Sequence, residues 1–104
     1  FPRYSPEHIE ENARLVDTLT RIADDADLTV AQLSLGWLLA RSPRVVPIVG
    51  TKRVRYVEEN AIAAREPLAP SIVAAVDAAF HADDVRGERY RPSAMARLGG
   101  KPER

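Results

Sequence analysis

The residues with the clearest chemical potential lie in one short stretch, where Gly50 and Thr51 precede three cations, Lys52, Arg53 and Arg55. The first amides of a helix have no acceptor within the helix, and the positive end of the helix dipole lies there too. Free amides beside cations favour a bound anion, so the stretch predicts a phosphate-binding turn. The same residues also fit a simple helix cap, Thr51, beside a solvated charged surface, and the local pattern leaves both interpretations open.

Two elements must position this turn. Residues 45–49 are rich in β-branched side chains and too short for a helix, so they predict a strand. The strand lacks polar alternation, which is typical of a parallel strand covered on both faces, although Pro47 removes one ladder donor. Apolar residues then recur at helical spacing and predict a helix over about residues 52–64. Gly50 would let the backbone turn sharply between the two, or come close to a ligand.

Three further helices are expected. Ser5 followed by Pro6 is a good start for a helix over residues 6–25. Thr29 and Gln32 stand at capping-box spacing and predict a second helix that runs to about residue 41. A third is expected over residues 70–80, and it starts poorly because Ala69 offers no capping hydroxyl.

Two polar or aromatic residues fall inside apolar stripes of these helices. Asn12 interrupts the stripe of the first helix, and Trp37 lies in the nearly all-apolar second helix. Buried amides and aromatic rings are usually structural, so we expect Asn12 to be satisfied by hydrogen bonds and Trp37 to pack against the core.

Composition limits the classes of function. The chain has 104 residues, of which 45% are hydrophobic and 29% charged, and fifteen basic residues balance fifteen acidic ones. The chain therefore has no net positive charge that would attract nucleic acid or an anionic membrane. There is no cysteine, which excludes disulfides and thiolate metal sites. No apolar run approaches the roughly 20 residues that span a bilayer, and no signal-peptide core is present. We expect a soluble, cytoplasmic protein.

The central part of the chain resembles the aldo-keto reductase family. The resemblance is carried by LTVAQLSLGWLLARSPRVVPIVGTKRVRYVEENAIAAREPLAP, which is similar to the family's AQLALAW-type helix, VVPIPGT-type strand and EEN-type adenosine-binding helix. Residues 86–90, RGERY, also look like the tail of bacterial members. The order of elements resembles the C-terminal portion of the family's barrel, about its last third.

The resemblance implies an α/β fold, the C-terminal part of a TIM (β/α)8 barrel, mostly helical in this chain with one short strand. It implies one partial domain, residues 1–104, with residues 81–104 as a tail whose end, from Gly99, is expected to be disordered. The implied activity is that of an oxidoreductase with the cofactor NADP(H), acting on a small-molecule carbonyl substrate in the complete enzyme. Such barrels take about 250 residues, so we expect a fragment or one piece of a split protein.

The same resemblance assigns the cofactor-binding residues. By alignment, the 2′-phosphate of the adenosine would be held by Gly50, Thr51, Lys52 and Arg53. The adenine would be reached by Glu59 and Asn60. Tyr56 departs from the family, because many members carry an arginine there, and this weakens the expected preference for NADP over NAD.

The resemblance assigns no catalytic residue and no metal ligand. The family's catalytic tyrosine, lysine, aspartate and histidine lie on early strands that this chain does not contain. The chain's own candidates match none of those positions: His8, His81, Tyr4, Tyr56 and Tyr90. We therefore expect the chain alone to be inactive, with the missing N-terminal barrel portion or further copies of itself as protein partners.

Two other interpretations are weaker. Residues 27–46 could pass for a helix-turn-helix, but an apolar run crosses the place of the turn and no later helix carries a base-reading basic face. A small helical module that buries its apolar helix in an unknown partner also fits the composition.

Overall fold

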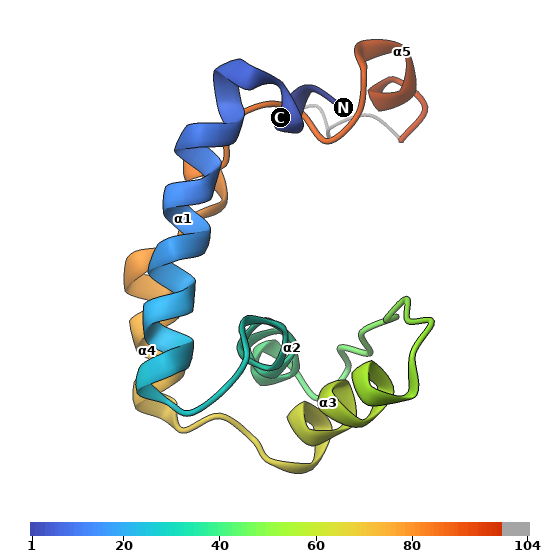
Figure 1. Ribbon diagram of the computed structural model, residues 1–104. Helices are drawn as coiled ribbons and strands as arrows, with labels where there is room; N and C mark the ends of the chain where they lie inside the picture. Colours follow the sequence, from blue (N-terminus) through green and yellow to red (C-terminus); the bar gives the residue numbers. More distant parts are fainter. Residues whose placement is uncertain (99–104) are drawn as a thin grey trace. The chain divides into compact units, whose positions relative to one another are not determined.

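The computed structural model describes residues 1–98, which are mainly helical (Figure 1). The expected disorder from Gly99 onward lies outside the described residues. With η marking a 3-10 helix, the elements in chain order are η1 (Pro2–Tyr4), α1 (Pro6–Asp25), α2 (Val30–Arg41), α3 (Val54–Arg65), α4 (Pro70–Ala79), η2 (Ala82–Asp84) and α5 (Pro92–Met95). None of these helices is long and apolar enough to cross a membrane.

Local capping signals set the helix boundaries. The backbone amide of Gln32 donates to the Thr29 hydroxyl at 3.1 Å, and the Thr29 amide donates back to the Gln32 side chain at 3.0 Å. This reciprocal pair is the predicted capping box, and it fixes the start of α2. Helix α1 covers the predicted residues, and α4 begins after Ala69 without a side-chain cap, as expected. These predictions are confirmed.

The predicted strand over residues 45–49 does not form. This segment belongs to no helix or strand, and Val46 and Ile48 are 81% and 99% exposed. A strand exists only when a neighbouring strand supplies the partners for its amides and carbonyls. Residues 1–98 contain no such neighbour, so the β-branched composition has no ladder to join. The strand prediction is therefore wrong for this structure.

The chain forms two compact units, and α1 runs from one into the other. We call Asp17–Phe80 the helical unit. Phe1–Val16 together with residues 81–98 form the terminal unit, as far as the structure describes it. Each unit has its own internal contacts and is described separately below.

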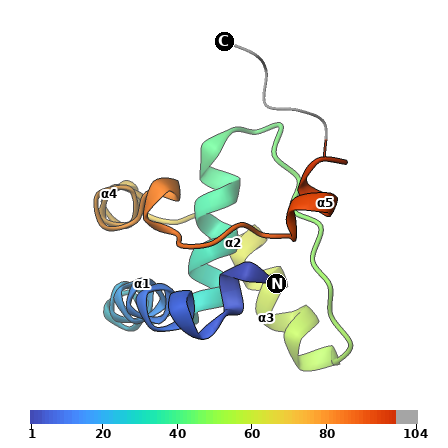
Figure 2. The same cartoon turned by 90° about the horizontal axis from the view of Figure 1, so that it is seen from above.

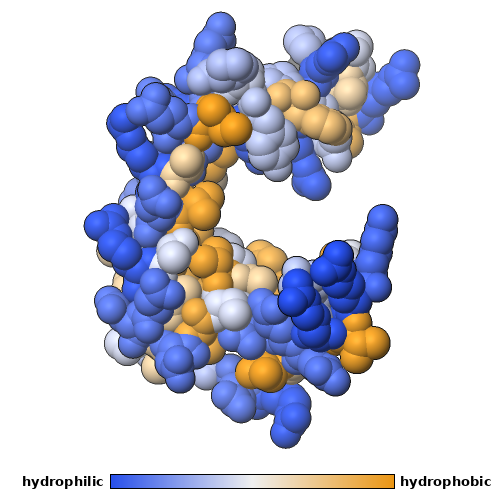
Figure 3. Space-filling model, viewed as in Figure 1, coloured by the Kyte–Doolittle hydropathy of each residue, from blue (hydrophilic) through white to orange (hydrophobic). Residues whose placement is uncertain are grey.

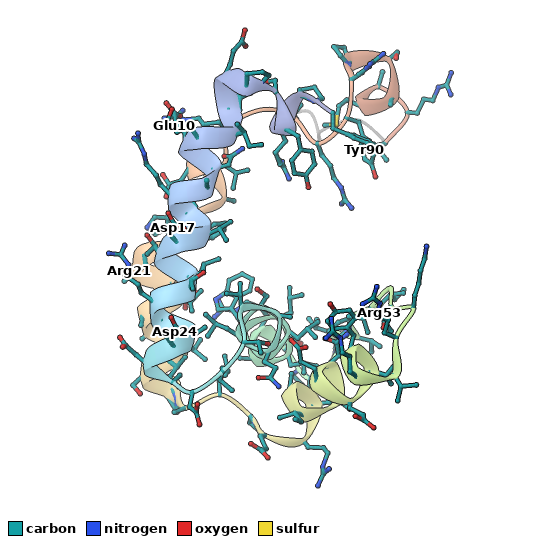
Figure 4. The ribbon with its side chains drawn as sticks, viewed as in Figure 1. Glu10, Asp17, Arg21, Asp24, Arg53 and Tyr90 are labelled. Carbon is teal, nitrogen blue, oxygen red and sulfur yellow. The ribbon has the colours of Figure 1, made fainter. Side chains whose placement is uncertain are left out.

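The core of the helical unit lies where α1, α2 and α4 meet. Ala23, Leu33 and Val76, one from each helix, are buried there. Figure 2, which looks nearly along α1, shows α4 beside it and α2 next to both. The residues packed around these three are Leu19, Ile22, Leu28, Val30, Trp37, Leu68 and Ile72. On the opposite, exposed side of α1, Figure 4 shows Asp17, Arg21 and Asp24 pointing away from the unit.

Trp37 ties α2 to α4. Its ring nitrogen donates a hydrogen bond to a carboxylate oxygen of Asp77 at 2.8 Å. The guanidinium of Arg41 binds the other oxygen of Asp77 at 3.0 Å and lies 4.4 Å from the centroid of the Trp37 ring. The indole is half-buried against the core, so the expected structural role of Trp37 is confirmed.

Gly36 allows close packing on another side of α2. A Cβ atom added to this buried glycine would lie 2.7 Å from Cγ of Leu68, in the segment that joins α3 to α4. Real Cβ atoms essentially never approach so closely. The missing side chain therefore lets Leu68 pack directly on the α2 backbone.

Asn12 organises the terminal unit. Its side-chain amide donates to the carbonyl of Arg3 at 3.1 Å and to the carbonyl of Arg86 at 2.9 Å. Its side-chain oxygen accepts the backbone amide of Arg86 at 2.8 Å. An ion pair of 2.9 Å between Arg86 and Glu11 supports the same contact. Asn12 is thus fully hydrogen-bonded, and the expected structural role is confirmed.

Candidate phosphate-binding turn

Thr51 folds the turn but does not cap the helix. Its hydroxyl donates to the carbonyl of Arg53 at 3.2 Å and accepts the Arg53 amide at 3.4 Å, as in a short hydroxyl-stabilised turn. Helix α3 begins at Val54. Its N-cap residue is Arg53, whose side chain makes no capping hydrogen bond. The interpretation of Thr51 as the helix cap is therefore wrong, because the hydroxyl is used on the residue before the helix.

The missing cap leaves donors free at the start of α3. The carbonyl of Arg53 accepts the amides of Tyr56 and Val57, at 3.0 and 3.3 Å. Within residues 1–98 the amides of Val54 and Arg55 have no hydrogen-bond acceptor. These two donors lie at the positive end of a helix of 12 residues, where negative charge is favoured.

Lys52 and Arg53 add positive charge at the same place. Both side chains are exposed, and neither forms an ion pair with an acidic group of the described residues. Figure 4 labels Arg53 at the start of α3. Gly50 is exposed as well, and nothing lies within 4 Å of the place where a Cβ would be. Its φ is not positive, so the turn does not need glycine for its conformation, and what Gly50 provides is open access to the backbone.

Arg55 and Tyr56 form a pair on the next turn of α3. The Arg55 guanidinium donates to the Tyr56 hydroxyl at 2.7 Å, and its central carbon lies 4.6 Å from the centroid of the ring. The pair is exposed. Stacking of this kind limits the motion of the guanidinium and leaves its other N–H groups available.

Glu59 links α3 to the capping box of α2. One of its carboxylate oxygens accepts the Thr29 hydroxyl at 2.7 Å, and its backbone carbonyl accepts the Gln32 side-chain amide at 3.1 Å. Asn60 follows on the same helix and is half-buried. The sequence identified Thr29 and Gln32 only as a cap, because a partner 27 to 30 residues away leaves no mark in local spacing.

The six predicted cofactor residues thus lie on one continuous segment, which consists of the turn and α3 as far as Asn60. Among the described residues there is no group of three or more acidic or histidine side chains that could hold a metal ion. The arrangement combines free amides and cations, which suits a phosphate group, while the Thr51 hydroxyl shapes the turn.

Comparison with known proteins shows which protein family this chain resembles. A model described as "Aldo/keto reductase family" matches residues 2–80. The chain is similar to the aldo-keto reductase yakc [NADP(+)] of Schizosaccharomyces pombe, with 40% identity over 97 residues, which cover 93% of this chain. It is also similar to the aldo-keto reductase str7 of Strobilurus tenacellus, with 33% identity over 89 residues, or 86% of this chain. No solved structure matches.

The matched part spans 28% of the yakc protein and 26% of str7, so the chain corresponds to little more than a quarter of each relative. The family match covers the whole helical unit, including the candidate turn and α3. The chain therefore belongs to the aldo/keto reductase family.

Proposed function

We propose that the chain is the C-terminal, NADP(H)-binding part of an aldo/keto oxidoreductase. The observation that carries the proposal is the turn before α3, shaped by the Thr51 hydroxyl, where two free amides and two exposed cations face no acidic partner in the described residues. The name of the S. pombe relative, which includes NADP(+), supports the choice of cofactor.

In this proposal the turn holds the 2′-phosphate of the adenosine. Lys52 and Arg53 supply charge, the amides after Arg53 supply directed donors, and Gly50 leaves the backbone open to the ligand. Charge-assisted hydrogen bonds to phosphate are about twice as strong as neutral ones, so the cations distinguish NADP from NAD. The bound cofactor supplies the hydride, and this chain holds its adenosine end.

The Arg55–Tyr56 pair fits the same role. Tyr56 stands where many family members carry an arginine, and its ring holds the Arg55 guanidinium one residue away. We infer that Arg55, stacked on Tyr56, replaces that arginine as a second contact to the phosphate.

Glu59 and Asn60 are proposed to bind the adenine. Glu59 uses one carboxylate oxygen for Thr29, and the other has no hydrogen-bond donor among the described residues. A carboxylate oxygen and a side-chain amide match the donor and acceptor edge of a purine. The bond to Thr29 would then hold Glu59 in position while its second oxygen contacts the base.

Residues 45–49 are proposed to become the last strand of the TIM barrel when a preceding strand is present. Pairing would satisfy their backbone and cover Val46 and Ile48, which are exposed here. The partner would be an N-terminal barrel portion, which would also bring the proton donor that reduction of a carbonyl requires. By itself the chain is proposed to lack reductase activity.

Complementation with an N-terminal barrel portion tests this function. The 104-residue chain alone should oxidise no NADPH above buffer with a panel of aldehydes, and it should bind the cofactor weakly by fluorescence. Mixing it with the N-terminal portion of a close relative should give a complex by native mass spectrometry, together with tighter NADPH binding. Turnover by the chain alone that is lost on mutation of Tyr56 or Tyr90 would contradict the proposal.

A further inference from the structure

A second group of side chains that could bind a ligand lies in the terminal unit, away in sequence from the phosphate turn. Phe1, Arg3, Tyr4, Arg89 and Tyr90 line a hollow of about 430 Å³. Small-molecule sites commonly measure about 300 to 1,000 Å³, so the size is suitable. The described lining residues bring two guanidinium groups and three aromatic rings, and none of them carries a carboxylate.

Hydrogen bonds to the backbone join the two segments that carry the lining residues. Asn12 binds the carbonyl of Arg3, which lines the hollow, and both backbone groups of Arg86, three residues before the lining residue Arg89. The contacts between Asn12 and Arg86 join parts of the chain that are 74 residues apart. The backbone segments on either side of the hollow are therefore held together by specific polar contacts.

Gly87 allows these two segments to approach each other closely. It has a φ of +79°, which disfavours other residues, and an added Cβ would lie 2.5 Å from the His8 ring and 2.9 Å from the Arg3 Cα. The Gly87 carbonyl accepts the Nε–H of Arg3 at 3.3 Å. That bond orients the guanidinium and leaves the donors on its two terminal nitrogens available.

The aromatic rings present faces and edges that no core covers. Phe1 and Tyr4 are 71% and 70% exposed and meet edge to face, with centroids 6.5 Å apart. The Phe1 ring lies 5.9 Å from that of Tyr90, and the Arg89 guanidinium lies 5.4 Å from the centroid of Tyr90. Exposed rings grouped with cations are the features that recognise a flat, negatively charged molecule.

We propose that this hollow is a binding site for a small aromatic carboxylate. The ring of the ligand would stack among the three aromatic side chains, and its carboxylate would bind the guanidinium groups of Arg3 and Arg89. Guanidinium and carboxylate match as two parallel hydrogen bonds, which gives direction as well as charge. The site shares no residue with the phosphate turn and does not depend on the proposed function.

Calorimetric titration of the 104-residue chain with 2-naphthoate tests the site. The naphthoate should bind saturably. Its neutral counterpart 2-naphthamide should bind about tenfold more weakly or worse, because it carries no negative charge and has only one acceptor oxygen for a guanidinium. Cyclohexanecarboxylate should also bind more weakly, since it has the charge but no aromatic face. Equal affinity for the naphthoate and the amide, or no saturable binding of naphthoate at millimolar concentration, would overturn the proposal.

Variants then locate the binding. Arg89→Gln and Arg3→Gln should each weaken 2-naphthoate by about tenfold. Arg65→Gln removes the same charge from the exposed end of α3 and should leave the affinity within about twofold. Arg89 is exposed and its contact is with Tyr90, so Arg89→Gln should keep the helical circular dichroism even if Arg3→Gln does not. A similar loss in Arg65→Gln, or none in Arg89→Gln, would show that no such site exists.

Discussion

At the scale of residues, the candidate turn depends on where each polar atom is already engaged. The Thr51 hydroxyl is used on the Arg53 backbone, and Arg55 is held by Tyr56. Lys52 and Arg53 remain exposed beside the free amides of α3. Arg53 directly precedes those amides and its side chain is not engaged elsewhere in the described residues, so it should contribute most directly to recognition of a phosphate.

Arg53→Ala tests this contribution in a barrel completed by an N-terminal portion. Loss of a charged hydrogen bond should weaken NADPH binding by about 1–3 kcal/mol and leave NADH almost unchanged, because NADH lacks the 2′-phosphate. Affinities from fluorescence titration provide the measurement. Arg65→Ala at the other end of α3 is the matched control and should change neither affinity. An equal loss for both cofactors would remove Arg53 from the 2′-phosphate.

At the scale of elements, one small network positions α3 against α2. Thr29 caps α2 through Gln32 and also donates to Glu59, while Gln32 donates to the Glu59 carbonyl. Gln32 is 8% exposed, so its hydrogen bonds are largely shielded from water. This polar cluster therefore sets the start of α2 and also fixes the position of α3 against it. The proposed adenine contacts lie on α3.

Substitution of Thr29 separates the hydroxyl from the size of the side chain. Thr29→Val removes the cap and the bond to Glu59, and should lower the free energy of unfolding of the chain by about 1–2 kcal/mol. Thr29→Ser keeps the hydroxyl and should cost only a few tenths of a kcal/mol. Urea denaturation followed by circular dichroism gives both values. If the two variants were equally stable, the network would not be what holds the helices.

At the scale of the whole molecule, the described residues bury few apolar side chains. The buried hydrophobic residues among them are Ala23, Leu33, Ala63 and Val76. Larger side chains such as Val46, Ile48 and Val54 are exposed, and Figure 3 shows hydrophobic side chains at the surface on the face displayed. Exposed apolar surface of this kind promotes association, because burying it against another chain is favourable.

We expect the isolated chain to be helical, marginally stable and prone to associate. Analytical ultracentrifugation should show concentration-dependent association, and circular dichroism should show a broad, low thermal transition. Ile48→Lys should reduce the association, because it places a charge in the exposed apolar segment. Ser71→Lys, at an exposed position of α4, is the control and should not. A sharp transition from a monodisperse monomer would show that these helices form a sufficient core without a partner.

Features that depend on near neighbours in the chain can be predicted from the amino-acid sequence. The helix starts at Pro6, Val30 and Pro70 follow from residues within a few positions, because capping and dihedral preferences act over one turn. The phosphate-like turn at Gly50–Arg53 is also visible in local sequence, whereas Glu59 and Asn60 were assigned only by the resemblance to the family. The strand predicted over residues 45–49 does not form in residues 1–98, because β-branched residues form a strand only when another strand supplies hydrogen bonds.

Hydrogen bonds between residues far apart in the sequence depend on the tertiary structure. Nothing in local spacing indicates that Asn12 binds Arg86, 74 residues later, or that Thr29 donates to Glu59. These contacts form when the packing of helices brings separate segments within about 3 Å, the range over which hydrogen bonds act. Thr51 likewise serves the turn and not the helix: α3 begins at Val54, two residues later than predicted, so the Thr51 hydroxyl bonds to the Arg53 backbone and the first helical amides remain open.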